Sequence, residues 1–113
     1  MRREIKTYKT PSGSAPVEKY FDKLTTRQVR DVAKVLRFVR EEKMVPVTIW
    51  KKITSNLWEV RVRTGSDAFR ILCFLDGGSL VILTSAFFKK TQQTPQNEIK
   101  TAEDRRTDYL SRK

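Results

Sequence analysis

The sequence has no histidine, a single cysteine, Cys73, and no long hydrophobic run. Without histidine, nucleophilic catalysis based on that residue is excluded, and we expect no metal site and no cofactor. Because Cys73 lies inside an apolar run and has no partner for an internal disulfide, we expect a small core residue in a reducing compartment. The apolar runs at 71–75 and 80–83 are too short to span a bilayer, and no apolar stretch follows the basic N-terminus. We therefore expect a cytoplasmic protein without a signal peptide or a membrane partner.

Positive charge is what the sequence has in excess. The 113 residues, the length of one domain, carry 24 Lys and Arg against 13 Asp and Glu, a net charge of +11. We expect a single domain over residues 1–113. For a chain this short, the charge predicts an anionic partner, with nucleic acid as the leading candidate and an acidic protein as a compatible one.

Hydrophobic periodicity predicts an α+β fold. We expect an antiparallel meander sheet with two N-terminal helices and a C-terminal helix, and residues 44–54 as a connection. We also expect the first strand to pair within that sheet. The predicted elements are, in order, a weak strand at 2–9, a helix at 17–24, a longer helix that Thr25 or Thr26 caps, strands at 58–63, 68–75 and 80–88, and a helix that opens at Thr94-Pro95.

The two turns between the last three strands predict which side chains share a face of the sheet. A four-residue loop at 64–67 places Arg61 opposite Arg70, and the Gly77-Gly78 turn places Arg70 near Ser85. Two arginines directly opposite each other repel, and an anion between them relieves the repulsion. The predicted face consists of Arg61, Arg63, Arg70, Ser85, Phe87 and Lys89.

A purely structural interpretation of these arginines remains open. Arg61 would then pair with Glu98 or Asp104, and Arg70 with Glu59. If the two arginines pointed to opposite sides, or each had its own internal carboxylate, a catalytic interpretation would lose its physical basis.

A cationic face of this kind suits RNA cleavage, in which the 2′-hydroxyl attacks the neighbouring phosphate. Arginines bind phosphate oxygens in a bidentate fork. With no histidine, the base would be a lysine with a pKa lowered by neighbouring cations, at Lys89, Lys90 or Lys52, or the carboxylate of Glu59, which is equally a candidate salt-bridge partner. Among the aromatic residues, we expect Trp58 and Phe69 in the core, and Phe87 or Phe88 as the stacking platform for a base.

Three blocks of sequence, in this order and spacing, resemble the RelE/HigB superfamily of toxins, in particular its phage-derived HigB-like branch. The likeness covers the chain from about residue 51 onward and is only topological before that. The blocks are LWEVRVR at 57–63, FRIL at 69–72 and FFKKTQQTP at 87–95.

The resemblance implies a RelE-like fold and cleavage of mRNA, commonly on the translating ribosome, to a cyclic or 3′-phosphate and a 5′-hydroxyl. It also implies a cognate antitoxin, often a helix-turn-helix protein of the HigA-like type. The cationic positions of the family fall on Arg61, with Arg63 beside it, on Arg70 and on the pair Lys89-Lys90.

One departure from the family concerns the base. Where RelE carries a lysine, this sequence has Glu59. Either Glu59 takes that role, or Lys51 or Lys52 reaches in from the preceding segment. Tyr109 is not assigned the role of the C-terminal tyrosine of RelE, because its spacing differs.

Two other functions compete with the nuclease. A ParE-like toxin of the same fold would bind DNA gyrase and cut no RNA, but such chains usually lack the full cationic cluster. A basic RNA-binding protein without catalysis would need only the bulk charge.

Overall fold

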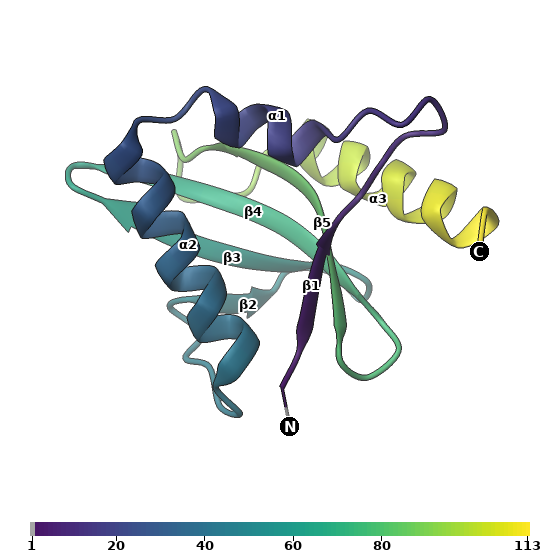
Figure 1. Cartoon of the computed structure of the whole chain (residues 1–113), viewed down its shortest axis with the longest axis horizontal. Helices are drawn as coiled ribbons and strands as arrows, with labels where there is room; N and C mark the ends of the chain where they lie inside the picture. The colour runs from purple at the N-terminus through teal and green to yellow at the C-terminus, as the bar shows by residue number, and fades with distance from the viewer. Residues whose placement is uncertain (1) are drawn as a thin grey trace.

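The computed structural model describes residues 2–113 as a mixed sheet with helices on both faces (Figure 1). The five strands lie in the order β1-β5-β4-β3-β2, and the α+β prediction with three helices is confirmed. In chain order, the elements are β1 (Glu4–Thr7), α1 (Pro16–Asp22), α2 (Thr26–Glu41), β2 (Trp50–Lys52), β3 (Trp58–Thr64), β4 (Asp67–Asp76), β5 (Leu80–Phe88) and α3 (Gln96–Ser111).

The prediction of an antiparallel meander is correct for β3, β4 and β5 but wrong at both edges of the sheet. β1 pairs in parallel with β5, and the two helices and three strands between them in the chain provide the long connection that a parallel pair needs. At the other edge, the segment predicted as a connection contains β2, which pairs with β3. Only Trp50 of its three residues is buried, so β2 is too short to show an alternating pattern.

Each face of the sheet has its own apolar core. On one face, α1 and α2 bury Val17, Val32 and Val39 against β3, β4 and β5. Thr25 begins α2 as predicted: its hydroxyl accepts a hydrogen bond from the Gln28 backbone, and the Gln28 side chain accepts one from the Thr25 backbone. The other core lies between the sheet and α3, where Ala102 is fully buried.

The start of α3 differs from the prediction. Pro95, not Thr94, occupies the capping position, and no side chain caps the helix there. Two tyrosines fix the other end of α3 to the sheet: the Tyr8 hydroxyl donates to Asp108 at 2.6 Å, and the Tyr109 hydroxyl donates to Asp76 at 2.8 Å.

The pairing of β4 with β5 corrects a second prediction. Arg70 lies opposite Phe87, and Ser85 lies opposite Leu72. The turn is one residue longer than expected, since Asp76 pairs with Leu80, and a bulge adds a further residue. The two one-residue shifts add to two residues. Since side chains on a strand alternate between the two faces, a shift of two residues leaves the predicted side chains on the same face.

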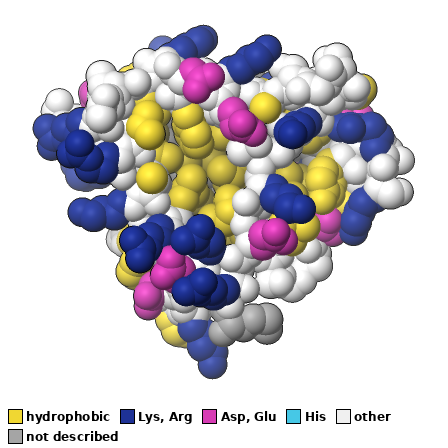
Figure 2. Space-filling model, viewed as in Figure 1, with side chains coloured by type: hydrophobic (Ala, Val, Ile, Leu, Met, Phe, Trp, Pro, Cys, Tyr) yellow, Lys and Arg dark blue, Asp and Glu magenta, His cyan; other side chains and the backbone are white. Residues whose placement is uncertain are grey.

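Apolar side chains are also visible on the outer surface. Figure 2 shows them gathered between α1 and α2, with Lys and Arg around them. Ile5, Phe21, Leu36 and Leu83 line a hollow there. Over residues 2–113, the structure contains no helix with the length and apolarity that crossing a membrane requires.

Candidate functional site

The hairpin of β3 and β4 brings two arginines together on the face of the sheet that α3 packs against. Arg61 lies directly opposite Arg70, as the sequence predicts. Gly65 in the turn has a φ of +62°, a conformation that β-branched and other L side chains rarely adopt. The turn therefore holds the register that places the two guanidinium groups side by side.

A single buried carboxylate lies between these arginines. Glu59 is 0% exposed, and its Oε1 accepts hydrogen bonds from Arg70 Nη1 at 2.6 Å and from Arg61 Nε at 3.1 Å. Its Oε2 accepts one from the Thr94 hydroxyl at 2.6 Å. Burial by itself would raise the pKa of Glu59, but the hydrogen bonds from Thr94 and Arg61 and the charge of Arg70 outweigh it, so the net pKa is lowered. Glu59 is therefore ionised at neutral pH.

The predicted structural alternative is half correct. Arg70 pairs with Glu59, but Arg61 pairs with the same carboxylate and not with Glu98 or Asp104. Two guanidinium groups share one carboxylate, so the cluster retains one positive charge.

Above this cluster lies a hollow of about 260 Å³, which we call the arginine hollow. Arg61, with its side chain 28% exposed, reaches it from β3, and Lys89 reaches it from the loop after β5. The Lys89 backbone donates to the Ala68 carbonyl at 2.9 Å, which fixes the start of that loop against β4. The lining residues are Thr48, Arg61, Val62, Arg63, Ala68, Arg70, Lys89 and Gln92.

The cations of this hollow are not all neutralised. Within residues 2–113, no carboxylate forms a salt bridge with Arg63 or Lys89. A second hollow of about 390 Å³ adjoins the first and shares both of these residues with it. Lys90 and Phe88 line only the second hollow, so the cationic surface continues from one to the other.

Three of the predicted site residues, Phe87, Lys51 and Lys52, lie outside the arginine hollow. Phe87 is only 9% exposed and belongs to the core beneath α3, so the prediction of a stacking platform there is wrong. Lys51 pairs across the sheet with Glu59 but lines neither hollow. The Lys52 ammonium lies 5.9 Å from the centroid of the Trp58 ring, and Trp58 packs against the core on the α1 and α2 side.

The other predicted aromatic residues lie mainly on that same side. Phe69 is buried and Trp58 partly buried, as expected for core residues. Phe88 is 43% exposed, and its ring centroid lies 4.5 Å from that of Phe69. It therefore packs on the opposite face from the arginines, although it reaches the second hollow at the end of β5.

The sequence did not identify Thr94, Gln92 or Thr48 as site residues. Thr94 has a visible signal, since threonine before proline is typical of a helix start, but its hydroxyl binds Glu59 instead. Gln92 and Thr48 come from irregular segments, and no pattern in the sequence marks them.

Replacing Thr94 with valine is expected to lower the free energy of unfolding by about 1.5–3 kcal/mol, because the lost hydrogen bond goes to a buried charge. The folded-state pKa of Glu59 lies below its unfolded value, so its stabilisation is present above that value and is lost as pH falls through the folded pKa. Without the Thr94 donor the folded pKa rises, and acid unfolding begins at a higher pH. Urea unfolding from about pH 7 to pH 3 measures both effects.

Thr94→Ser is the matched control, because it keeps the hydroxyl. It should retain most of the stability and the acid profile. Equal losses in Thr94→Ser and Thr94→Val would contradict the role given to this hydrogen bond.

In the described part of the chain, His, Cys, Asp and Glu side chains form no group of three that could hold a metal ion.

A comparison with family models matches residues 19–107 to the family described as "Phage derived protein Gp49-like (DUF891)". The match covers both hollows and most of the sheet. A search of the curated proteins finds no match.

Proposed function

The chain belongs to the phage-derived Gp49-like family, which is part of the RelE/HigB-like toxins, and from this premise we propose that it is an mRNA endoribonuclease of a type II toxin–antitoxin system. The observation that carries the proposal is the arginine hollow, where Arg61 and Arg70 share one carboxylate and Lys89 has none. We propose that RNA is cleaved there, on the translating ribosome, without a metal.

The hollow has the charge and the size for one phosphodiester of a single strand. Its volume of about 260 Å³ lies just below the usual range of small-molecule pockets, which suits a single phosphate group and its sugars. Because Glu59 compensates only one of the two guanidinium charges, a phosphate provides the second anion that the arginine pair lacks. Arg63 and Lys90 would hold the neighbouring phosphates of the strand.

In the proposed reaction, the 2′-oxygen forms a bond to phosphorus while the bond from phosphorus to the 5′-oxygen breaks. The products are a 2′,3′-cyclic phosphate and a 5′-hydroxyl. Arg61 and Arg70 stabilise the charge on the phosphate oxygens in the transition state. We assign the Lys89 amine as the acid that protonates the leaving 5′-oxygen, while the proton of the 2′-hydroxyl passes to water.

For Glu59 we propose a positioning role instead of general-base catalysis. Its side chain is fully buried, its two oxygens accept three hydrogen bonds and its pKa is lowered, so it has little tendency to take a proton from a substrate. It orients both guanidinium groups. Lys51 and Lys52, the other candidates for the base, lie outside the hollow and take no part in this scheme.

The remaining elements of the proposal rest on the resemblance to this toxin family. We propose a RelE-like fold in a single domain, a cytoplasmic location and a cognate antitoxin, of the helix-turn-helix HigA-like type, as the protein partner. Phe88 at the second hollow is the candidate for stacking on a base beyond the cleaved bond.

Induction of the chain in bacteria is expected to arrest growth and to produce new mRNA 5′ ends within translated codons. Sequencing of 5′-hydroxyl ends before and after induction measures this directly. If growth stopped with no new RNA ends and purified gyrase lost supercoiling activity, the ParE-like alternative would replace the nuclease. RNA binding without either effect would favour a non-catalytic RNA-binding protein.

A further inference from the structure

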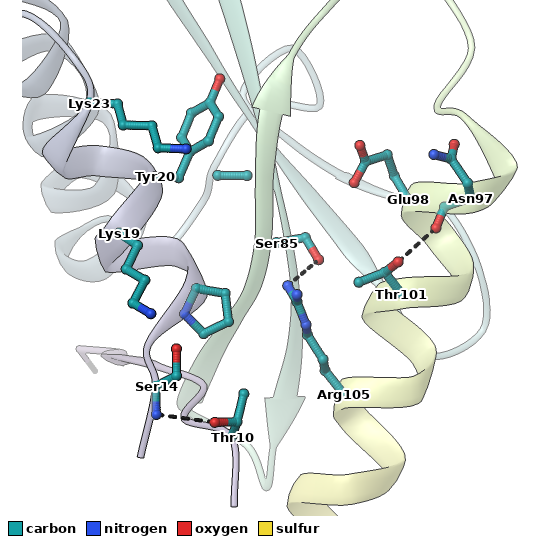
Figure 3. Close-up of a pocket in the computed structure, with 12 residues that line it drawn as sticks. Thr10, Ser14, Lys19, Tyr20, Lys23, Ser85, Asn97, Glu98, Thr101 and Arg105 are labelled. Atoms are coloured by element: carbon teal, nitrogen blue, oxygen red, sulfur yellow. Dashed lines mark hydrogen bonds between the residues drawn. The ribbon is translucent and has the colours of Figure 1, made fainter. Parts of the chain in front are cut away.

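A second groove lies away from the arginine hollow, between α1 and α3. Figure 3 shows Lys19, Tyr20 and Lys23 of the α1 region along one wall, α3 with Glu98 and Arg105 along the other, and β5 between them. Its volume is about 590 Å³, larger than that of the arginine hollow or of the second hollow beside it.

The floor of this groove is a free edge of the sheet. β1 pairs with β5 only along Leu80–Leu83, and the Arg105 guanidinium covers the Thr84 carbonyl at 2.7 Å. The Lys89 backbone bonds to Ala68, so by antiparallel alternation Phe87 directs its N–H and C=O toward β4, and Ala86 directs its own outward. No strand among residues 2–113 pairs with Ala86 on that side.

One polar side chain in the groove also lacks a partner. The Tyr20 hydroxyl is buried and makes no hydrogen bond within the described residues. Buried polar groups are rarely left in this state, because the water they lose on burial is then not replaced by any partner. The ring is held in place by Phe69, whose centroid lies 6.2 Å away in an edge-on arrangement.

The charge of the walls is positive. Lys19, Lys23 and Arg105 face one carboxylate, Glu98, and none of the three cations forms a salt bridge in the part of the chain that the structure describes. Arg105 bonds only to uncharged oxygens, those of Thr84 and Ser85.

We propose that this groove binds an extended, acidic segment of a partner protein, which adds as a strand to the free edge of β5 beside α1. A sheet edge offers alternating N–H donors and C=O acceptors, which match a polypeptide backbone and not a nucleic acid. Acidic side chains of the segment would lie against Lys19 and Lys23, and the Tyr20 hydroxyl would donate to it. If the proposed function holds, the antitoxin is the partner that carries this segment, but the site does not depend on the nuclease activity.

The test uses the full chain, labelled with ¹⁵N, and the synthetic decapeptide (Glu-Val)5 as the probe. We expect saturable binding with shifts centred on the amides of Ala86 and Phe88. The lysine analogue (Lys-Val)5 should bind about tenfold more weakly or worse, because its charges are repelled. Tyr20→Phe should weaken (Glu-Val)5 binding several-fold while keeping the fold.

Two further probes separate strand addition from charge attraction. One version of (Glu-Val)5 carries N-methyl groups on every valine and another on every glutamate, so that each blocks one edge of the strand. Strand addition predicts that one of the two loses at least about tenfold in affinity, since main-chain hydrogen bonds supply the binding. Equal binding by both would overturn the proposal.

A matched pair of charge reversals locates the site. Lys19→Glu with Lys23→Glu should weaken peptide binding about tenfold or more. Arg30→Glu with Lys34→Glu, an equally spaced pair on the exposed face of α2, makes the same change in net charge and should leave binding within about twofold.

The proposal is wrong if (Glu-Val)5 does not bind, if its shifts centre on Arg61 and Arg70, or if a ten-nucleotide uridine RNA shifts the Ala86 region as strongly as the peptide does. Because these readouts are independent of RNA cleavage, their failure would leave the proposed function intact.

Discussion

Arg70→Ala is expected to lower the rate of mRNA cleavage by about 10²–10³-fold, because it removes a positioned donor that stabilises charge in the transition state. The Arg70 side chain is 9% exposed and bonds to Glu59 at 2.6 Å, so its guanidinium has one fixed orientation at the base of the hollow. Glu59 would keep its bonds from Arg61 and Thr94, and the fold should survive. Single-turnover cleavage of a reporter mRNA on purified ribosomes measures the rate, and thermal unfolding checks the fold.

Two control variants make the result specific. Arg30→Ala removes an exposed arginine of α2 and the same unit of charge, and its cleavage rate should stay within about twofold of the wild type. Arg70→Lys keeps the charge but loses the fork geometry, so we expect an intermediate rate. Full activity and toxicity in a folded Arg70→Ala protein would contradict the assignment of the site.

Glu59→Gln is expected to cost about 3–5 kcal/mol of stability, because it leaves buried arginine charge without its counter-ion. Domains of this size are stable by about 5–15 kcal/mol in total, so the melting temperature should fall by roughly 10–20 °C. Urea and thermal unfolding measure the loss. Glu4→Gln, the same change at an exposed position of β1, should alter stability by no more than about 0.5 kcal/mol.

A double variant tests whether the loss comes from the ion pair. If Arg70 is the charge left unpaired, Glu59→Gln combined with Arg70→Met should be more stable than Glu59→Gln alone.

The rate of RNA cleavage by Glu59→Gln, measured at a temperature at which this variant is folded, distinguishes positioning from general-base catalysis. A lower rate with an unchanged pH profile indicates positioning, whereas loss of the rate dependence on a carboxyl pKa would identify Glu59 as the base.

The sequence predicted the β3–β4 hairpin well, because its alternation and its turn both constrain the register. Arg61 and Arg70 were placed opposite each other on those grounds, and the structure confirms the pairing. The neighbouring hairpin was less predictable, since neither the longer turn nor the bulge before Ser85 has a local signal in the residues. The shared face of Arg70 and Phe87 was nevertheless predicted, because the two shifts add to two residues and side chains on a strand alternate with a period of two.

What the sequence could not predict depends on contacts between distant segments. Thr94 lies 35 residues from Glu59, and only the folded chain shows that its hydroxyl completes the hydrogen bonds of that carboxylate. The sequence also did not predict that Glu59 forms salt bridges with both arginines, because salt bridges were assigned from the sequence with one carboxylate for each arginine. The parallel position of β1 and the free edge that it leaves on β5 also follow from the topology and not from any local pattern.

The most direct test of the central claim is an NMR titration of the wild-type chain with a short RNA whose 2′-hydroxyls are replaced by hydrogen, so that it binds without being cut. The guanidinium Nε–H signals of Arg61 and Arg70 should shift together and saturate at one RNA per protein, with Lys89 responding in parallel. Shifts confined to the exposed face of α2 that carries Arg30 and Lys34, with both of these arginine signals unmoved, would show that the cluster around Glu59 is a structural ion pair and that the phosphate binds elsewhere.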